Sequence, residues 1–241
     1  MIQSFSVTDI GKMRNLNQDY VYTTDGQIGN LPNLYIVADG MGGHNAGDFA
    51  ARLTISTMIE TIAELEDAEA EVLLDKSVTA ANKAVFRCAG TSEDLEGMGT
   101  TVVAATIDDR RLTIANVGDS RLYLCREGGL RQITRDHSWV EEMIRRGGLK
   151  REDARNHPDK NIITKAVGVE ETVRIDFFEL TLQEKDLVLM CTDGLTNMLE
   201  DETIYGVLLG TGTSEEKAKE LVRRANENGG RDNISVILID L

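Results

Sequence analysis

Short runs of apolar and β-branched residues are the feature that most limits how this chain can fold. Each run has the length and composition of a β-strand. The runs are residues 20–24, 34–38, 100–108, 111–117, 121–125, 173–180, 186–192 and 234–240. The dipeptides Asp109-Arg110 and Gly128-Gly129 are short enough to connect hairpins, so we expect antiparallel pairing there.

Helical periodicity occurs in separate stretches between the expected strands. Apolar residues share one helical face in residues 55–62 and again in residues 74–88. A capping box at Thr213 begins a third helix, and a capping serine at Ser138 begins a shorter one. A regular alternation of strand and helix would predict a parallel sheet, and this order does not have it. The sequence predicts an α+β fold with antiparallel sheets covered by helices.

Composition limits the cellular setting and the partners. The chain has 241 residues, 41% of them hydrophobic, and nothing divides it, so we expect one domain over residues 1–241. It has three cysteines, no 18-residue apolar run and no signal sequence, which together favour a cytoplasmic protein. The net charge of −15 argues against nucleic acid or an anionic membrane as a partner. A monomer is the default expectation.

Aspartates recur at the ends of the expected strands. Asp39, Asp119 and Asp193 follow strands, and Asp19 and Asp232 precede them. Any one of them could be a turn residue, as we expect for Asp25 in Asp25-Gly26. Together, carboxylates without His or Cys neighbours form the oxygen-rich environment of Mg²⁺, Mn²⁺ or Ca²⁺ rather than of zinc.

Seven strings of residues occur in one order along almost the whole chain. They are TDIGKMRNLNQD (8–19), VADGMGGHNAG (37–47), MGTTVV (98–103), NVGDSRLY (116–123), DHSW (136–139), CTDGL (191–195) and GGRDNISVI (229–237). Together they resemble the PPM family, the metal-dependent type 2C protein Ser/Thr phosphatases, in its short bacterial form. The resemblance implies two antiparallel sheets packed face to face with helices on both outer sides. It also implies a protein phosphatase that hydrolyses phosphoserine and phosphothreonine by metal-activated water.

The resemblance assigns metal ligands to this chain. It implies two Mn²⁺ or Mg²⁺ ions in a core site. Asp39 would bridge them, the Gly40 carbonyl would bind one, and Asp193 and Asp232 would hold the other. Asp119 would contribute to a third, weaker ion.

The resemblance also assigns residues around the metals. Asp19 would hold metal-bound waters, directly or from the next shell outward. Arg14 would be a catalytic residue that receives the substrate phosphate, since a planar guanidinium donates two parallel hydrogen bonds. Many family members have Glu where this chain has Gln18, and many have His where it has Met41. His44 is therefore the candidate general acid, and its alternative role is hydrogen bonding at the start of the next helix.

Two alternative functions are open at this point. The spacing of Cys125 and Arg131 matches that of cysteine-dependent phosphatases, but the preceding histidine is missing and the segment is an expected hairpin. The chain could also be a module that binds phosphoproteins without turning them over. The presence of Asp39, Asp193 and Asp232 favours the enzyme. Its expected partners are phosphorylated proteins and a Ser/Thr protein kinase that it opposes.

The segment from about Asp136 to Ala166 is expected to be a helical flap beside the metal site, as in the PPM family. It contains seven Lys and Arg residues and a glycine pair, Gly147-Gly148, that could act as a hinge. We expect the flap to select phosphoprotein substrates, whereas the alternative is a solvated excursion that covers the sheets. His137 and His157, within it, receive no catalytic role.

Overall fold

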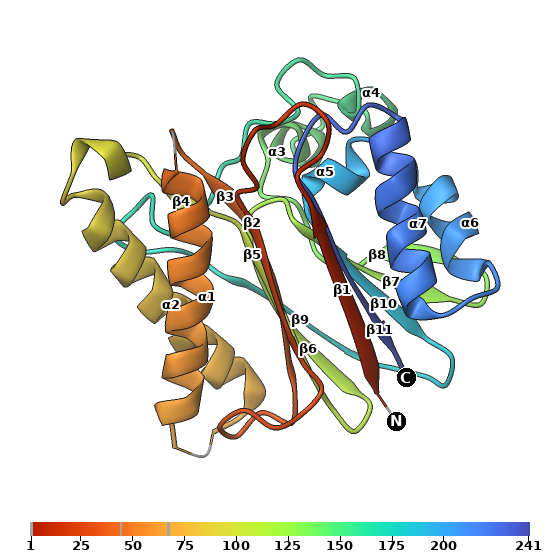
Figure 1. The fold of residues 1–241 in the computed structure, drawn as a ribbon, viewed down its shortest axis with the longest axis horizontal. Helices are drawn as coiled ribbons and strands as arrows, with labels where there is room; N and C mark the ends of the chain where they lie inside the picture. Colours follow the sequence, from red (N-terminus) through yellow and green to blue (C-terminus); the bar gives the residue numbers. More distant parts are fainter. Residues whose placement is uncertain (1, 44, 67) are drawn as a thin grey trace.

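Two antiparallel sheets, packed face to face, form the centre of the molecule (Figure 1). The computed structural model describes residues 2–43, 45–66 and 68–241. The first sheet has the order β2 (Asp19–Thr24), β3 (Leu34–Met41), β5 (Val102–Asp108), β6 (Arg111–Val117) and β9 (Asp176–Thr181), with β4 (Gly99–Thr100) paired to β3. The second has the order β1 (Gln3–Asp9), β11 (Ile234–Asp240), β10 (Leu187–Cys191), β7 (Arg121–Arg126) and β8 (Gly129–Gln132).

Helices cover the outer face of each sheet. The long helices α1 (Ala46–Glu64) and α2 (Ala70–Ala89) lie on the first sheet, and a short 3₁₀ turn (Glu93–Leu95) follows them. The helices α5 (Asp193–Thr196), α6 (Asp201–Leu209) and α7 (Ser214–Glu227) lie on the second sheet. Among the described residues, none of the helices is both long and apolar enough to span a membrane.

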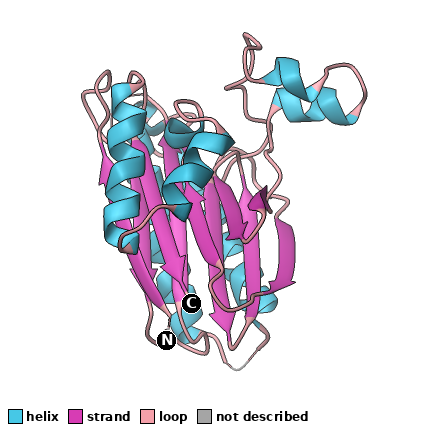
Figure 2. Cartoon of the chain, turned by 90° about the vertical axis from the view of Figure 1, so that its right-hand side faces the viewer, coloured by secondary structure: helices cyan, strands magenta, loops and turns pink. Residues whose placement is uncertain are grey.

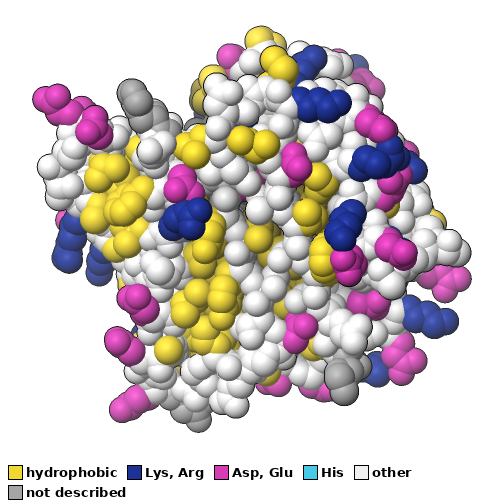
Figure 3. Space-filling model, in the orientation of Figure 1, with side chains coloured by type: hydrophobic (Ala, Val, Ile, Leu, Met, Phe, Trp, Pro, Cys, Tyr) yellow, Lys and Arg dark blue, Asp and Glu magenta, His cyan; other side chains and the backbone are white. Residues whose placement is uncertain are grey.

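The apolar residues of the strands fill the space between the sheets. Tyr35 and Val37 of the first sheet and Leu122, Met190 and Ile237 of the second are fully buried in one cluster. On one face of the molecule, apolar side chains also lie along β1 and β2, where the edges of the two sheets meet (Figure 3). The expected α+β fold, with two antiparallel sheets between helical layers, is therefore confirmed.

Most of the expected elements are present, and the differences have physical reasons. Thr213 forms both hydrogen bonds of its capping box, and the Ser138 side chain accepts from the Glu141 amide, as expected. The strand expected at 173–180 begins only at Asp176. Strand β1 was not expected, because its half-exposed Ser and Thr residues interrupt the apolar run of an edge strand.

Helices α3 (Trp139–Arg145) and α4 (Arg151–Ala154) form a small unit that projects beyond the ends of the strands (Figure 2). This unit lies within the expected flap. Its cations are largely paired: Arg145 and Arg146 contact Glu142, and Arg151 contacts Glu141. The flap therefore presents less free positive charge than its composition suggests.

Candidate metal centre

Antiparallel pairing brings the predicted aspartates to one edge of the sandwich. Asp19, at the start of β2, pairs in register with Asp39, near the end of β3. Strand β6 ends beside Asp119, β10 ends beside Asp193, and β11 begins after Asp232. A pocket of about 290 Å³ opens at this edge, and Asp39, Asp119, Asp193 and Asp232 line it together with Arg14 and Gly40.

Two threonines from the MGTTVV string hold Asp39 in place. The Thr100 hydroxyl and the Thr101 amide each donate to the Asp39 carbonyl at 2.9 Å. The Asp39 amide donates in return to the Thr101 hydroxyl at 3.0 Å. These bonds fix the backbone of Asp39 at the edge of the pocket that this residue lines. The strings in the sequence thus include supporting residues as well as ligands.

Gly40 must be a glycine because main chain packs against it on two sides. A Cβ atom at Gly40 would lie 2.0 Å from the Gly47 carbonyl oxygen and 2.7 Å from the Gln18 carbonyl oxygen. The Gly40 amide donates to that Gln18 carbonyl at 3.1 Å. The close packing keeps the Gly40 backbone in the wall of the pocket, where its carbonyl could serve as a ligand.

Asp19 lies behind the pocket and is almost completely buried, with 4% of its surface exposed. Its Oδ2 accepts hydrogen bonds from Thr192 at 2.9 Å and from Ser235 at 2.8 Å. Its Oδ1 is buried without a hydrogen-bond partner among the described residues. Burial raises the pKa of Asp19 to about 7, and the two hydroxyl donors oppose that shift. An unpartnered acceptor at this place fits a carboxylate that receives a metal-bound water.

The carboxylates around the pocket destabilise one another in the absence of a cation. Burial raises the pKa of Asp39 well above its usual range, and repulsion from Asp19 and Asp193 adds to the shift. Burial likewise raises the pKa of Asp193 to about 6, with repulsion from Asp232 as the next cause. The pKa of Asp119 is raised well above its usual range by burial and by Asp193. A divalent cation would remove this strain by neutralising the charge.

The donor set suits a hydrated ion better than a closed cage. In the described part of the chain, no three His, Cys, Asp or Glu side chains together form a ready-made metal cage. Mg²⁺ usually keeps several waters and takes only one or two carboxylates from the protein. Aspartates supported by a backbone carbonyl and by an unpartnered Asp19 oxygen therefore fit Mg²⁺ or Mn²⁺. Closed zinc sites use Cys and His ligands, and neither type is among the described residues that line this pocket.

Arg14 lies at the rim of the pocket and contacts a predicted ligand. Its Nη2 donates to Asp232 Oδ2 at 2.8 Å, and about half of the Arg14 side chain is exposed. Asn233 fixes the loop that carries Arg14, since its Nδ2 donates to the carbonyls of Ile10 and Leu16 at 2.9 Å each. The Asn233 Oδ1 accepts from the Gln18 amide at 2.9 Å.

Sequence reasoning missed the supporting roles of Asn233, Thr192 and Ser235. All three lie within the seven strings, but only the folded chain shows which groups they contact. His137 is also a supporting residue: its Nδ1 accepts from the Gly118 amide at 3.0 Å, and its own amide donates to the Gly118 carbonyl at 2.9 Å. It thereby joins the base of the flap to the loop that carries Asp119.

The remaining predicted residues lie in different places relative to the pocket. Met41 lines the pocket, and His44 lies outside the described residues. Asp25 accepts from Ser4 and from Tyr35 and does not line the pocket, in keeping with the expected turn role. The cysteine-phosphatase alternative is wrong, because Arg131 pairs with Leu124 in the ladder of the β7–β8 hairpin, which forms no phosphate-binding loop.

Comparison with known proteins agrees with this geometry. The family model for protein phosphatase 2C matches residues 12–238. A serine/threonine phosphatase, stp, from Listeria monocytogenes is 44% identical over 239 residues, which are 97% of this chain and 93% of that protein. The solved serine/threonine phosphatase of S. agalactiae superposes with a TM-score of 0.92 at 37% identity, covering 100% of both chains.

A third similar protein has been solved with metal ions bound. The catalytic domain of the serine/threonine phosphatase PstP, solved in complex with two manganese ions, has a TM-score of 0.87 at 33% identity and covers 99% of this chain and 97% of its own. With the family model spanning most of the sequence, the chain belongs to the protein phosphatase 2C family of metal-dependent serine/threonine phosphatases.

Proposed function

We propose that this chain hydrolyses phosphoserine and phosphothreonine in proteins with two Mn²⁺ or Mg²⁺ ions held in the aspartate pocket. The observation that carries the proposal is the convergence of four residues on one pocket. Asp39 comes from the end of β3, Asp193 from the start of α5, Asp232 from the loop before β11, and Arg14 from the loop between β1 and β2. These residues are far apart in the sequence, and turn chemistry alone gives no reason for them to meet.

Each residue has a distinct task in this proposal. Asp39 would contact both ions, the Gly40 carbonyl would hold one of them, and Asp193 and Asp232 would hold the other. Asp119 would contribute to a third, weaker ion. When bound, such ions supply Lewis-acid stabilisation of phosphate charge and lower the pKa of coordinated water.

The protein groups around the ions orient the reactants. Asp19 uses its unpartnered Oδ1 to hold a water in position, while Thr192 and Ser235 fix its other oxygen. Arg14 binds the substrate phosphate with its planar guanidinium, which donates to two phosphate oxygens at once. Proton delivery to the leaving alcohol is assigned to His44, since Met41 has no proton to give.

The proposal also covers the substrates, the oligomeric state and the location of the enzyme. The substrates are phosphorylated proteins, and a Ser/Thr protein kinase supplies them. The enzyme acts as a single-domain monomer in the cytoplasm, and the flap at about 136–166 selects among substrates.

Phosphate release from phosphopeptides tests the proposal. Metal-stripped protein should release phosphate from phosphoserine and phosphothreonine peptides only after Mn²⁺ or Mg²⁺ is added back, and much more slowly from phosphotyrosine peptides. A module that binds without turnover would retain phosphopeptides in a pull-down assay and release no phosphate at any metal concentration. That second result would overturn the proposal.

A further inference from the structure

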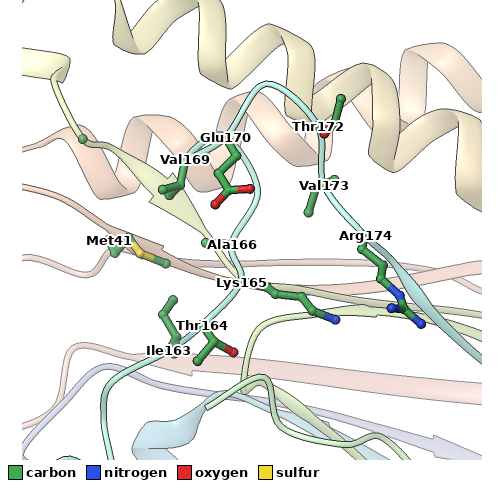
Figure 4. Close-up of a pocket in the computed structure, with 11 residues that line it drawn as sticks. Met41, Ile163, Thr164, Lys165, Ala166, Val169, Glu170, Thr172, Val173 and Arg174 are labelled. Carbon is green, nitrogen blue, oxygen red and sulfur yellow. The ribbon is translucent and has the colours of Figure 1, made fainter. Parts of the chain in front are cut away.

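A second pocket, of about 530 Å³, adjoins the metal pocket and is larger than it. The two share Met41 and Ile163 in their linings. The close-up shows these two residues at one end of the second pocket and Arg174 at the other, with Lys165 between them (Figure 4). The pocket therefore leads from the metal centre to a cation.

The wall of this pocket is built into the fold. Val167 and Thr100 exchange backbone hydrogen bonds at 2.9 and 3.0 Å, so the segment 165–170 is joined to β4. The buried Asn82 of α2 accepts from the Gly168 amide at 2.7 Å and donates to the Glu170 carbonyl at 3.0 Å. A segment held at both places is a preformed surface and not a loose loop.

The pocket combines apolar surface with a positive charge at Arg174. Val169 is 49% exposed, so it offers apolar surface to the pocket that it lines. Lys165 is engaged, since its Nζ lies 3.2 Å from Asp176. Among the described residues, no carboxylate lies within ion-pair distance of Arg174. Glu170 also lines the pocket, but its side chain lies on the Val169 side, away from Arg174 (Figure 4).

We propose that this pocket binds the substrate segment next to the phosphorylated residue, with an apolar side chain between Met41 and Val169 and an acidic side chain at Arg174. The inference rests on the proposed phosphatase function and deepens it by naming a substrate class. Continuity with the metal pocket would bring the chain next to a bound phosphoresidue into this pocket. Arg174 then selects an acidic side chain on that segment.

The charge near this pocket decides whether an acidic side chain on the peptide is preferred, although the whole chain has a net charge of −15. At physiological ionic strength, interactions between exposed charges are screened beyond about 8 Å. An acidic side chain in this pocket therefore senses Arg174 and its near neighbours more strongly than the distant carboxylates. An exposed pair of this kind has a modest energy, so the expected preference is about two- to fivefold.

A charge-reversal experiment tests the acidic half of the proposal. Phosphothreonine peptides that differ only in one aspartate or lysine, moved position by position along each side of the phosphoresidue, are compared by kcat/KM in Mn²⁺. Wild type should prefer aspartate about two- to fivefold at one or more positions. Arg174→Glu should reverse the preference at those positions, and Arg174→Gln should abolish it.

The matched control is Arg110→Glu, which changes the same charge in the β5–β6 turn at the opposite end of the first sheet. It should leave the aspartate-to-lysine ratio as in wild type. An unchanged ratio in both Arg174 variants, or an equal change in the control, would overturn the docking site. A wild type that releases no phosphate from any peptide would instead overturn the proposed function.

A second comparison tests whether an apolar side chain of the peptide binds between Met41 and Val169. Peptides with leucine in place of alanine next to the phosphothreonine should be favoured by wild type, because the leucine covers exposed Val169. Val169→Ser should lower that leucine advantage. If the advantage is absent in wild type or unaffected by the substitution, no apolar side chain enters the pocket.

Discussion

Arg14 and Asp232 form an ion pair across the mouth of the metal pocket, with 2.8 Å between Nη2 and Oδ2. The hydrogen bond to Asp232 raises the pKa of Arg14 further above its usual value, so the guanidinium stays charged. The pair links the residue proposed to bind phosphate to one proposed to bind metal. A metal ion at Asp232 would compete with Arg14 for the same oxygen and leave the guanidinium free for substrate.

Arg14→Ala should raise the KM for phosphopeptides and should not weaken metal binding. The loss of a charge-assisted hydrogen bond costs about 1.5–3 kcal/mol, which corresponds to about a 10- to 150-fold rise in KM. Because the substitution also frees Asp232, the Mn²⁺ titration should show equal or tighter affinity. Steady-state kinetics and calorimetry measure the two effects separately.

Arg14→Lys is the matched variant, since it keeps the charge and loses the planar fork. The KM of Arg14→Lys for phosphopeptides should lie between that of wild type and that of Arg14→Ala. An unchanged KM with a lower kcat in Arg14→Ala would show that Arg14 acts in the transition state alone.

Asp19→Asn should stabilise the metal-free protein at pH 8, and this gain should shrink as the pH falls and vanish below about pH 4. The folded-state pKa of Asp19 is about 7, raised from 3.8, so between these values the native state binds a proton that the unfolded chain does not. Stability of the wild type therefore falls as the pH rises through about 7. Asparagine can still accept from Thr192 and Ser235, and it removes the buried charge.

Thermal unfolding in EDTA at a series of pH values makes this comparison. At pH 8 the free energy of unfolding of Asp19→Asn should exceed that of wild type by about 1–3 kcal/mol. One pKa unit corresponds to about 1.4 kcal/mol, and structural relaxation around a buried charge reduces the full effect. A variant that is less stable than wild type at pH 8 would show that the charged form of Asp19 is stabilised in the metal-free fold.

Gly40→Ala should lose metal-dependent activity and about 1–3 kcal/mol of stability, the usual cost of overpacking. The added Cβ would lie 2.0 Å from the Gly47 carbonyl oxygen, so α1 or β3 must move. Gly43→Ala is a close control, because a Cβ atom added at Gly43 would meet nothing within 4 Å among the described residues. Equal loss in both variants would mean that the Gly40 packing is not what positions the pocket.

Shortening the flap around Gly147-Gly148 should change the ranking of phosphopeptide substrates more than the hydrolysis of p-nitrophenyl phosphate. Gly147 adopts a φ of 74°, and a Cβ atom added there would meet nothing within 4 Å in the described part of the chain, so the turn is exposed at the end of α3. One ion pair, Arg155 to Glu200 at 2.6 Å, joins the flap to the start of α6. Hydrogen exchange should find the flap opening more readily than β3 or β10. Loss of both activities in proportion would mean that the flap supports the metal centre itself.

The sequence predicted the layers of the fold because strand and helix periodicities are local properties. Tyr35 and Ile237 belong to apolar runs of strand length, and both are buried between the two sheets. Strand β1 escaped prediction because its stability comes from its pairing with β11, which lies more than 200 residues away. Its own residues alternate only weakly between apolar and polar.

In the candidate site, too, the sequence predicted the features that are local and missed those that depend on distant parts of the chain. The aspartates were found because each stands at the end of a recognisable strand. The hydrogen bonds from Asn233 to the loop of Arg14, and from Ser235 to Asp19, join distant parts of the chain and follow only from the tertiary fold. The neutralisation of the flap cations likewise depends on which side chains meet.

Calorimetric titration of Mn²⁺ into metal-stripped protein tests the central claim most directly. The comparison is between wild type, Asp39→Asn and Asp25→Asn, since both aspartates precede a glycine and, of the two, only Asp39 lines the pocket. The account predicts that Asp39→Asn loses Mn²⁺ binding and phosphopeptide hydrolysis together, while its metal-free fold is at least as stable as wild type. Asp25→Asn should bind and turn over like wild type. Undiminished Mn²⁺ binding in Asp39→Asn would contradict the assignment of this pocket as the metal centre.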